Sequence, residues 1–372
     1  MAIDLKIDRR GLFYGAFAAL ISSSLALSQR GARAASQWPD ASFFTAARID
    51  GIDGGALLCN EGVCSFALPA RAHAPVLMRD TNSVILVGRR PGTFAAALDL
   101  KSPDAPARMF HPIRDHRFVG HAAVNGEMLV TTEMEAFTGE GAAVLRDART
   151  FAPRARFDAG IEPHDVLFAR GGEVLVVAVG GIARAADVKG PAINAGRIES
   201  AILELDPRSG AVLKRHVLPP DMSSLSLRHM ALAPDGETIA FGMQDQDRST
   251  TRPLLGVLRL GRGIDLLPLP ADDEGALRSY IGSVAIDSSG AYIAATSPKG
   301  GVAGLWSLGN GRWLGGYRLA DVCGLASDAA PASFWATSGH GDVVQLNAGD
   351  EGPAAASHWR ATAAFDNHLL RS

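Results

Sequence analysis

The sequence has few cysteines, few aromatic residues and no excess of positive charge. Its 372 residues include 3 cysteines and 6% aromatics, and 36 Lys+Arg stand against 39 Asp+Glu, a net charge of -3. Because phosphate neutralisation needs a basic surface, this balance argues against binding to nucleic acid. The nucleophile elbow, the phosphate-binding loop and the dinucleotide fingerprint are also absent from the sequence, which disfavours the enzyme classes that use them.

The first 35 residues are predicted to be an export signal and not part of the fold. Arg9-Arg10 precede an apolar run, Leu12 to Leu27, and Ala32-Arg33-Ala34 supplies small residues of the kind that signal peptidases recognise. A transmembrane anchor is the alternative, but the run is short and contains Ser22 to Ser24. The paired arginines resemble a twin-arginine signal. We therefore expect residues 36–372 in the periplasm, with no membrane span after cleavage.

The three cysteines do not form a metal or haem motif of the Cys-x-x-Cys type. Cys59 and Cys64 flank a predicted hairpin turn at Glu61-Gly62, and this spacing is compatible with a cross-strand disulfide or with free thiols. Cys323 is then unpaired. It fits either a buried structural thiol or a soft metal ligand.

One unit recurs along the chain: a strand that often begins with histidine, a turn such as Asn125-Gly126, and a second strand. The units begin, 41 to 65 residues apart, at His73, His121, His164, His229, Ser283, Gly324 and His368. Further hairpins lie between the units, without an amphipathic helical pattern. Four short strands per unit at this period predict an all-β, seven-bladed β-propeller. A two-domain β structure is the alternative.

The seventh unit is truncated, because the chain ends shortly after His368. The mature N-terminus supplies three strands that lack an innermost partner. Pairing of the two ends would complete the blade and remove open sheet edges. We therefore expect Asp366 to Leu370 to lie beside Phe43 to Ile49.

Five of the ten histidines begin an innermost strand, so they should gather at one mouth of the central channel. One explanation is structural, because WD-type propellers use Gly-His at this place to bond a turn aspartate, and Gly120-His121 fits that pattern. A second is that converging imidazoles bind a transition metal, iron or copper. A third is binding or acid-base chemistry on a small molecule. The predicted metal ligands are His73, His121, His164, His229, His368 and Glu133.

Loops that leave the second strands should face the same mouth. Arg89, Arg90, Gln244 and Gln246 are the residues predicted to bind a cofactor or small molecule there. Lys299 and His340 belong to equivalent loops, and each of these residues alone also fits a solvated loop position. The longest segment between units, Gly180 to Arg228, could cap the mouth or be a tolerated insertion.

As a set, several segments resemble an uncharacterised bacterial family of exported seven-bladed propellers, domain of unknown function 1513. The matching segments span almost the whole mature chain and include "GRRPG", "GHAAVNGEMLVTTE", "GIEPHDVL", "SLRHMALAPDG" and "DNHLL". The resemblance includes the five repeated histidines as motif residues without giving them a role. It implies twin-arginine export and a setting of iron acquisition, with periplasmic iron-uptake proteins as partners. Relatives often have His-Pro where this chain has Ala183 to Ala186.

Three functions fit these observations. The first is a periplasmic propeller that binds a transition metal, iron by family context, and assists its uptake or handling. The second is an enzyme, a lactonase-like hydrolase or an oxidoreductase, with arginines holding an anionic substrate. The third is a docking platform for another protein.

Overall fold

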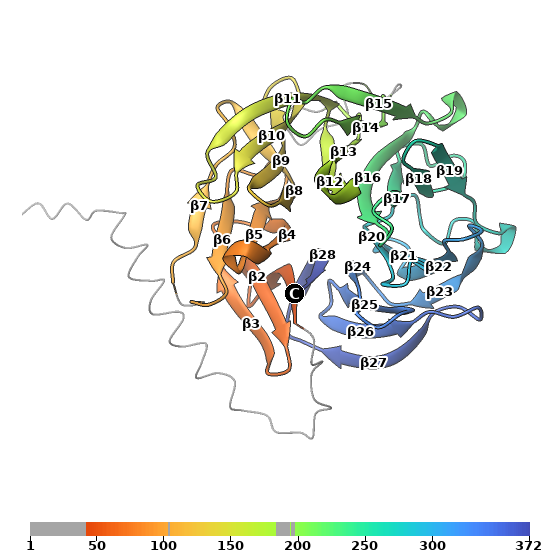
Figure 1. The fold of residues 1–372 in the computed structure, drawn as a ribbon. Helices are drawn as coiled ribbons and strands as arrows, with labels where there is room; N and C mark the ends of the chain where they lie inside the picture. The colour runs from red at the N-terminus through yellow and green to blue at the C-terminus, as the bar shows by residue number, and fades with distance from the viewer. Residues whose placement is uncertain (1–41, 103–104, 184–193, 195–197) are drawn as a thin grey trace, which may run out of the picture.

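Seven four-stranded antiparallel sheets form a ring in the computed structural model, which describes residues 42–102, 105–183, 194 and 198–372 (Figure 1). This is the predicted seven-bladed propeller, and it excludes two separate β domains. The predicted signal, residues 1–35, lies outside the described residues. Much of the predicted capping loop, including residues 184–193, does so too.

Six blades consist of four consecutive strands, and the innermost strand comes first in each blade. They are β4 (Ala72–Met78), β5 (Ser83–Gly88), β6 (Ala95–Asp99) and β7 (Arg108–Phe110); β8 (His116–Asn125), β9 (Met128–Glu135), β10 (Glu140–Asp147) and β11 (Pro153–Ile161); β12 (Pro163–Ala169), β13 (Val174–Val179), β14 (Ala201–Leu205) and β15 (Val212–Val217); β16 (Leu225–Leu232), β17 (Thr238–Asp245), β18 (Leu255–Arg259) and β19 (Gly263–Leu267); β20 (Ser283–Ile286), β21 (Tyr292–Ser297), β22 (Val302–Ser307) and β23 (Trp313–Arg318); and β24 (Val322–Ser327), β25 (Ser333–Ser338), β26 (Asp342–Asn347) and β27 (Ala354–Arg360).

The seventh blade joins the two ends of the chain, as predicted. It comprises β28 (Ala364–Arg371), β1 (Phe43–Ile49), β2 (Ile52–Cys59) and β3 (Gly62–Ala67), in that order from the centre. The register places Phe44 opposite Leu370 and Thr45 opposite Leu369. In Figure 1 the blue C-terminal strand accordingly lies against the orange N-terminal strands. Ring closure therefore depends on the last eight residues of regular structure.

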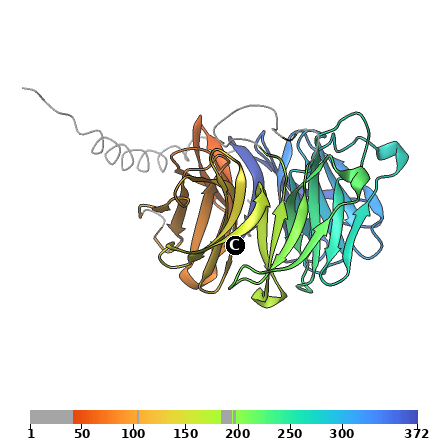
Figure 2. The same ribbon diagram turned by 90° about the horizontal axis from the view of Figure 1, so that it is seen from above.

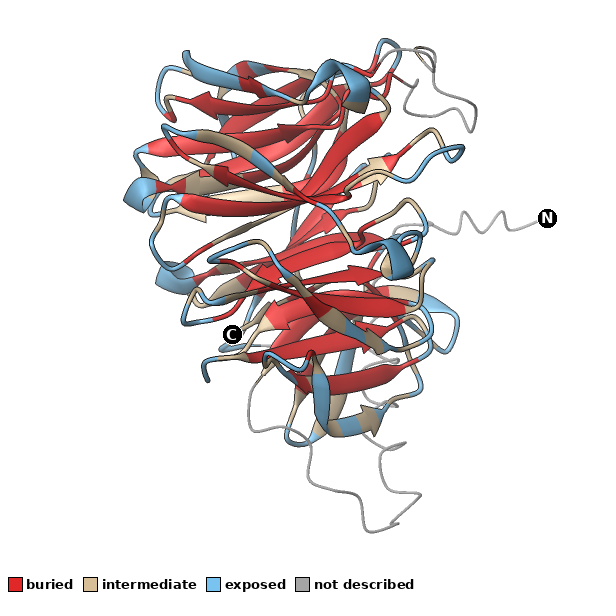
Figure 3. Ribbon diagram, turned by 90° about the vertical axis from the view of Figure 1, so that its right-hand side faces the viewer, coloured by how far each residue is buried: buried red, intermediate tan, exposed pale blue. Residues whose placement is uncertain are grey.

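Apolar side chains fill the spaces between neighbouring blades. Trp306, Phe241 and Phe334 are among the largest fully buried side chains, whereas the outermost strands β15 and β27 are mostly exposed. Figure 2 shows the blades from the side of the ring, and Figure 3 shows that the buried residues lie mainly on the strands. Burial on both faces explains why the inner strands have nearly continuous apolar sequences such as Val174–Val179.

Helical structure in the described residues is limited to four single 3-10 turns. These are η1 (Arg79–Thr81), η2 (Arg170–Gly172), η3 (Pro220–Met222) and η4 (Ala271–Asp273). A helix with the length and hydrophobicity needed to cross a bilayer is therefore missing from the part of the chain that the structure describes.

Cys59, Cys64 and Cys323 all carry free thiols. The register places Cys64 opposite Leu57, on the same strand face as Cys59.

Candidate metal centre

A local irregularity in the innermost strand positions each repeated histidine. Pairing to the second strand skips residues between Ala72 and Pro75, Phe118 and Ala122, Pro163 and Asp165, Leu227 and Met230, and Phe365 and Leu369. Each gap contains one histidine of the repeat. A β-bulge bends its strand and re-aims the side chain, which explains how these imidazoles leave the pleat and face the centre.

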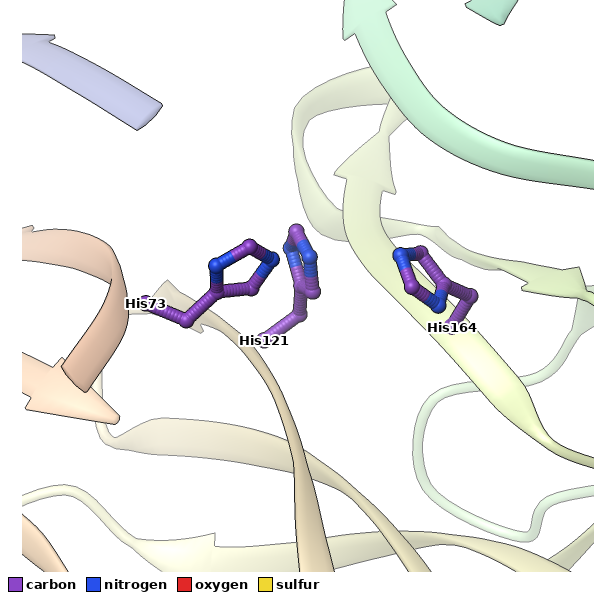
Figure 4. Close-up of side chains that lie close together, drawn as sticks. All are labelled: His73, His121 and His164. Carbon is purple, nitrogen blue, oxygen red and sulfur yellow. The ribbon is translucent and has the colours of Figure 1, made fainter. Parts of the chain in front are cut away.

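The five imidazoles converge from five blades. His121 lies with its ring centroid 5.0 Å from that of His73, 5.2 Å from His164, 5.4 Å from His229 and 4.6 Å from His368. The other close pairs are His73 with His368 at 4.5 Å, His164 with His229 at 4.9 Å, His229 with His368 at 4.7 Å and His73 with His229 at 6.2 Å. We call these residues the histidine cluster; Figure 4 shows three of them.

Two overlapping groups of nitrogen atoms are close enough to hold a metal ion. One comprises His73, His121 and His164, the other His121, His229 and His368, and within each group the ligand atoms lie within 4.8 Å of one another. The Nε2 atoms of His121, His164, His229 and His368 are buried, and none of them has a hydrogen-bond partner in the part of the chain that the structure describes. A buried polar atom without a partner is costly, so these atoms suit a bound ligand.

Four of the five histidines, His73, His164, His229 and His368, have a pKa below its usual value, which favours their neutral rings. Burial lowers the pKa of His73 to about 4, against an opposing effect of Asp366. Burial also holds the pKa values of His164, His229 and His368 well below the usual value, with further lowering by neighbouring cationic groups and imidazoles. A metal ion therefore has few protons to displace from the cluster.

Carboxylates from neighbouring blades orient two of the imidazoles. Asp366 Oδ1 lies 2.9 Å from His73 Nδ1, and Asp165 Oδ1 lies 3.0 Å from His121 Nδ1. A carboxylate only accepts hydrogen bonds, so Nδ1 carries the proton in both rings and Nε2 keeps its lone pair. Metal-binding histidines commonly have this carboxylate partner.

Guanidinium groups surround these carboxylates. Asp366 accepts hydrogen bonds from Arg71 at 2.6 Å and from Arg89 at 3.3 Å. Burial opposes ionisation of Asp366, but His73, Arg89 and Arg71 outweigh it and hold the pKa of this carboxyl well below its usual value. The aspartate therefore stays charged beside the cluster.

The buried Glu162 is the second anionic centre. It pairs with Arg90, and it accepts a hydrogen bond from Arg228 Nη1 at 2.6 Å. Arg228 Nη1 also lies 2.9 Å from His164 Nδ1. Burial lowers the pKa of Arg228 to about 10, so this guanidinium is still charged at neutral pH.

Glu133, predicted as an acidic ligand, is engaged elsewhere. Its carboxylate is fully buried and accepts hydrogen bonds from Arg146 at 2.5 Å, from Thr131 at 2.7 Å and from the backbone N–H of Ile113 at 2.8 Å. The metal-compatible groups of the described residues contain histidines only. We therefore omit Glu133 from the candidate site, because Arg146 on β10 neutralises it.

The other predicted residues lie around the cluster in different ways. Arg89 and Arg90 reach it through Asp366 and Glu162, as described above. Gln244 forms an isolated backbone bridge with Tyr280, and the side-chain nitrogen of Gln246 is buried without a partner. Lys299 Nζ lies 5.0 Å from the ring centroid of Tyr280, whose hydroxyl accepts a hydrogen bond from Asn367. His340 is exposed.

Cys323 fits the structural alternative and not the ligand alternative. Its thiol is buried and donates to the carbonyl oxygen of Phe365 at 3.4 Å. Burial raises the pKa of this thiol to about 12, so the thiolate that metals prefer is disfavoured.

The hydrogen bonds of the cluster run between blades. His73 on β4 contacts Asp366 on β28, and His121 on β8 contacts Asp165 on β12. Both histidines bond an aspartate, as in the structural explanation, but the aspartate lies on the innermost strand of a neighbouring blade and not in a turn. Asp165, Glu162 and Asp366 were missed by the sequence reasoning, although each lies within two positions of a repeated histidine. Arg228, which directly precedes the repeated histidine His229, was not predicted as a site residue either.

Fold and site together define a seven-bladed β-propeller with a histidine cluster at the centre of the ring. The chain belongs to the family described as "Protein of unknown function (DUF1513)", whose model matches residues 66–372. This confirms the family resemblance seen in the sequence. No curated protein matches the sequence.

Two solved structures share the fold at low sequence identity. A chain of the Kuenenia stuttgartiensis hydrazine synthase superposes with a TM-score of 0.59 at 13% identity, covering 89% of this chain and 98% of that one. A chain of a mitotic checkpoint complex superposes with a TM-score of 0.56 at 11% identity, covering 78% of this chain and 80% of that one. At these identities the likeness concerns the propeller architecture alone.

Proposed function

We propose that this protein is a periplasmic metal-handling propeller that binds one transition metal ion in its histidine cluster and assists the uptake or delivery of that ion. The observation that carries the proposal is the convergence of five imidazoles from five blades, four of which have a buried Nε2 atom without a hydrogen-bond partner among the described residues. A closed ring brings equivalent positions of the innermost strands together, but it does not require those positions to be histidine.

The chemistry of the donor atoms narrows the class of metal. Imidazole nitrogen suits iron, copper, zinc and nickel, whereas magnesium and calcium prefer oxygen ligands. The carboxylates nearest the cluster face the Nδ1 atoms of His73 and His121 and are occupied there. Iron is the first metal to test because the family resemblance suggests iron acquisition, with copper as its competitor.

Metal titration tests the proposal. Chelator-treated protein is titrated with Fe(II) without oxygen and with Cu(II), and bound metal is measured by calorimetry and by elemental analysis after gel filtration. We expect one ion per chain, and we expect the double variant His121→Ala, His368→Ala to lose it. The variant His111→Ala is the matched control, because His111 is exposed and bonds only the carbonyl of Thr93 in the described residues. Wild-type protein without stoichiometric metal, or a double variant that binds as wild type does, would overturn the proposal.

A further inference from the structure

One histidine of the cluster has the wrong tautomer for a metal ligand. Arg228 Nη1 lies 2.9 Å from His164 Nδ1. A guanidinium group only donates hydrogen bonds, so His164 Nδ1 must be the acceptor. In the neutral ring the single proton then resides on Nε2. His73 and His121 show the opposite arrangement, because Asp366 and Asp165 accept from Nδ1.

The Nε2–H group of His164 lies in the cluster, and the described residues offer it no acceptor. His164 is only 9% exposed, and its Nε2 is buried and unpartnered. Its ring centroid lies 5.2 Å from that of His121 and 4.9 Å from that of His229, and Figure 4 shows its ring across a gap from that of His121, with His73 on the far side of His121. A buried donor without an acceptor is costly, so the group needs an acceptor at this place.

The surroundings favour an acceptor that carries negative charge. Four guanidinium groups, those of Arg71, Arg89, Arg90 and Arg228, pair with Asp366 and Glu162, and Asp165 beside His121 adds a third carboxylate. The positive charges of the described residues here exceed the negative ones by one. Neutral imidazoles add no negative charge, so a divalent ion in the cluster keeps its full charge inside the protein. An anion bound to that ion would offset this charge.

From this geometry we infer that the group of His121, His229 and His368 holds the metal, joined by His73, whose ring centroid lies 4.5 Å from that of His368 and 5.0 Å from that of His121. We infer further that His164 donates a hydrogen bond from Nε2 to a small anion bound to the same ion. The inference rests on the proposed function and adds to it a second ligand, a small anion. Arg228 is a positioning residue, because it fixes the tautomer of His164 without touching the anion. The arrangement resembles the preorganised donors that stabilise oxyanions in enzymes.

The tautomer can be observed in the metal-free protein. Nitrogen-15 chemical shifts of the histidine rings distinguish Nε2–H from Nδ1–H. We expect His164 in the Nε2–H form, and His73 and His121 in the Nδ1–H form. The variant Arg228→Met should release His164 from its single tautomer, whereas Arg228→Lys retains a donor and should preserve it. His164 in the Nδ1–H form in wild-type protein would overturn the inference without touching the proposed metal site.

Anion binding tests the role itself. Copper(II)-loaded protein is titrated with azide, and the charge-transfer band reports the anion. We expect His164→Leu to keep one copper per chain and to weaken azide binding by about tenfold, the contribution of one charge-assisted hydrogen bond. His121→Leu should lose copper instead. If His164→Leu loses copper as His121→Leu does, or binds azide as wild type does, the inference is wrong. If wild-type protein binds no copper, the proposed binding of copper in the histidine cluster is wrong, and so is the inferred copper-bound anion.

Discussion

Asp366 and Arg228 act on neighbouring histidines in opposite ways, because a carboxylate only accepts hydrogen bonds and a guanidinium only donates them. Asp366 leaves the Nε2 lone pair of His73 free toward the cluster. Arg228 places a proton at that position of His164. Two histidines that look equivalent in the sequence repeat therefore have different chemistry. The difference comes from partners on other blades.

Loss of the carboxylate beside His73 should weaken metal binding. Asp366→Asn keeps the size of the side chain but removes the charge that fixes the Nδ1–H tautomer, so we expect metal affinity to fall by about 10- to 100-fold. Competition calorimetry against a chelator of known affinity measures the change. Asp50→Asn is the control, because Asp50 is exposed in a turn. Equal affinity in wild type and Asp366→Asn would show that this carboxylate does not tune the site.

The buried thiol of Cys323 should resist alkylation at pH values where an ordinary cysteine reacts. Its pKa is raised to about 12, so at a given pH the reactive thiolate is rarer than at an ordinary cysteine, and the fraction grows only as the pH approaches that value. We expect iodoacetamide at about pH 8 to modify the exposed Cys64 of reduced, folded protein and to leave Cys323 intact. Peptide mass spectrometry reads both sites, and unfolded protein is the control. Equal rates at the two thiols in the folded protein would contradict the buried position.

The five histidines of the site were predictable from the sequence, but the side chains that bond to them were not. The repeat places five histidines at equivalent positions, and a closed ring brings equivalent positions together. Asp165 follows His164 in the sequence, yet its carboxylate contacts His121. Glu133 was expected at the metal, yet it pairs with Arg146. The partner of each carboxylate depends on which side chain of the next strand or blade lies nearest to it. The spacing of residues along one strand does not contain that information.

At the scale of the strand, the bulge is the feature that aims each histidine. The second strand helps to hold it, because Thr45 Oγ1 donates to the carbonyl of His368 at 2.7 Å and Thr132 Oγ1 donates to the carbonyl of His121 at 3.2 Å. The shift is not limited to strands with a repeat histidine: β20 lacks both, whereas β24 has the shift between Val322 and Leu325 and places Cys323 in the gap. Strands and turns were predictable from apolar runs and turn residues. The bulges were not, because a bulge is defined by register against a partner.

Gly120 shows how closely the bulge and the cluster are packed. Its φ is +116°, and a Cβ atom at this position would lie 2.8 Å from Cδ2 of His73. Gly120→Ala should therefore strain the backbone by about 1–3 kcal/mol and displace the His73 ring. We expect a lower melting temperature and weaker metal binding, measured by thermal unfolding and calorimetry.

Gly126→Ala is the matched control for Gly120→Ala. Gly126 also has a positive φ, of +54°, but a Cβ atom there would have nothing within 4 Å. We expect this variant to lose some stability and to keep wild-type metal affinity. Equal losses of affinity in the two variants would show that backbone strain alone, and not contact with His73, is responsible.

At the scale of the whole molecule, closure of the ring and completion of the site depend on the same strand. β28 pairs with β1 to close the seventh blade, and it also supplies His368 and Asp366. Closure was predictable because the N-terminal strands lacked an innermost partner and the chain ended in half a unit. The coupling of closure to the site was not, because it requires the contact of Asp366 with His73 on the next blade.

A metal ion in the cluster should therefore stabilise the closed ring. Ligands from β8, β16 and β28, joined by His73 on β4, would tie the closing strand to three other blades. A ligand at 100 times its Kd stabilises the folded state by about 2.7 kcal/mol. We expect metal to slow amide hydrogen exchange in β28 more than in β23, the outermost strand of a blade without a repeat histidine. Mass spectrometry of peptic peptides measures both strands, and His368→Ala should remove the difference. If metal slows amide hydrogen exchange equally in β28 and β23 of the wild-type protein, the ion does not stabilise ring closure. Local opening of the closing strand would then be independent of the bound ion.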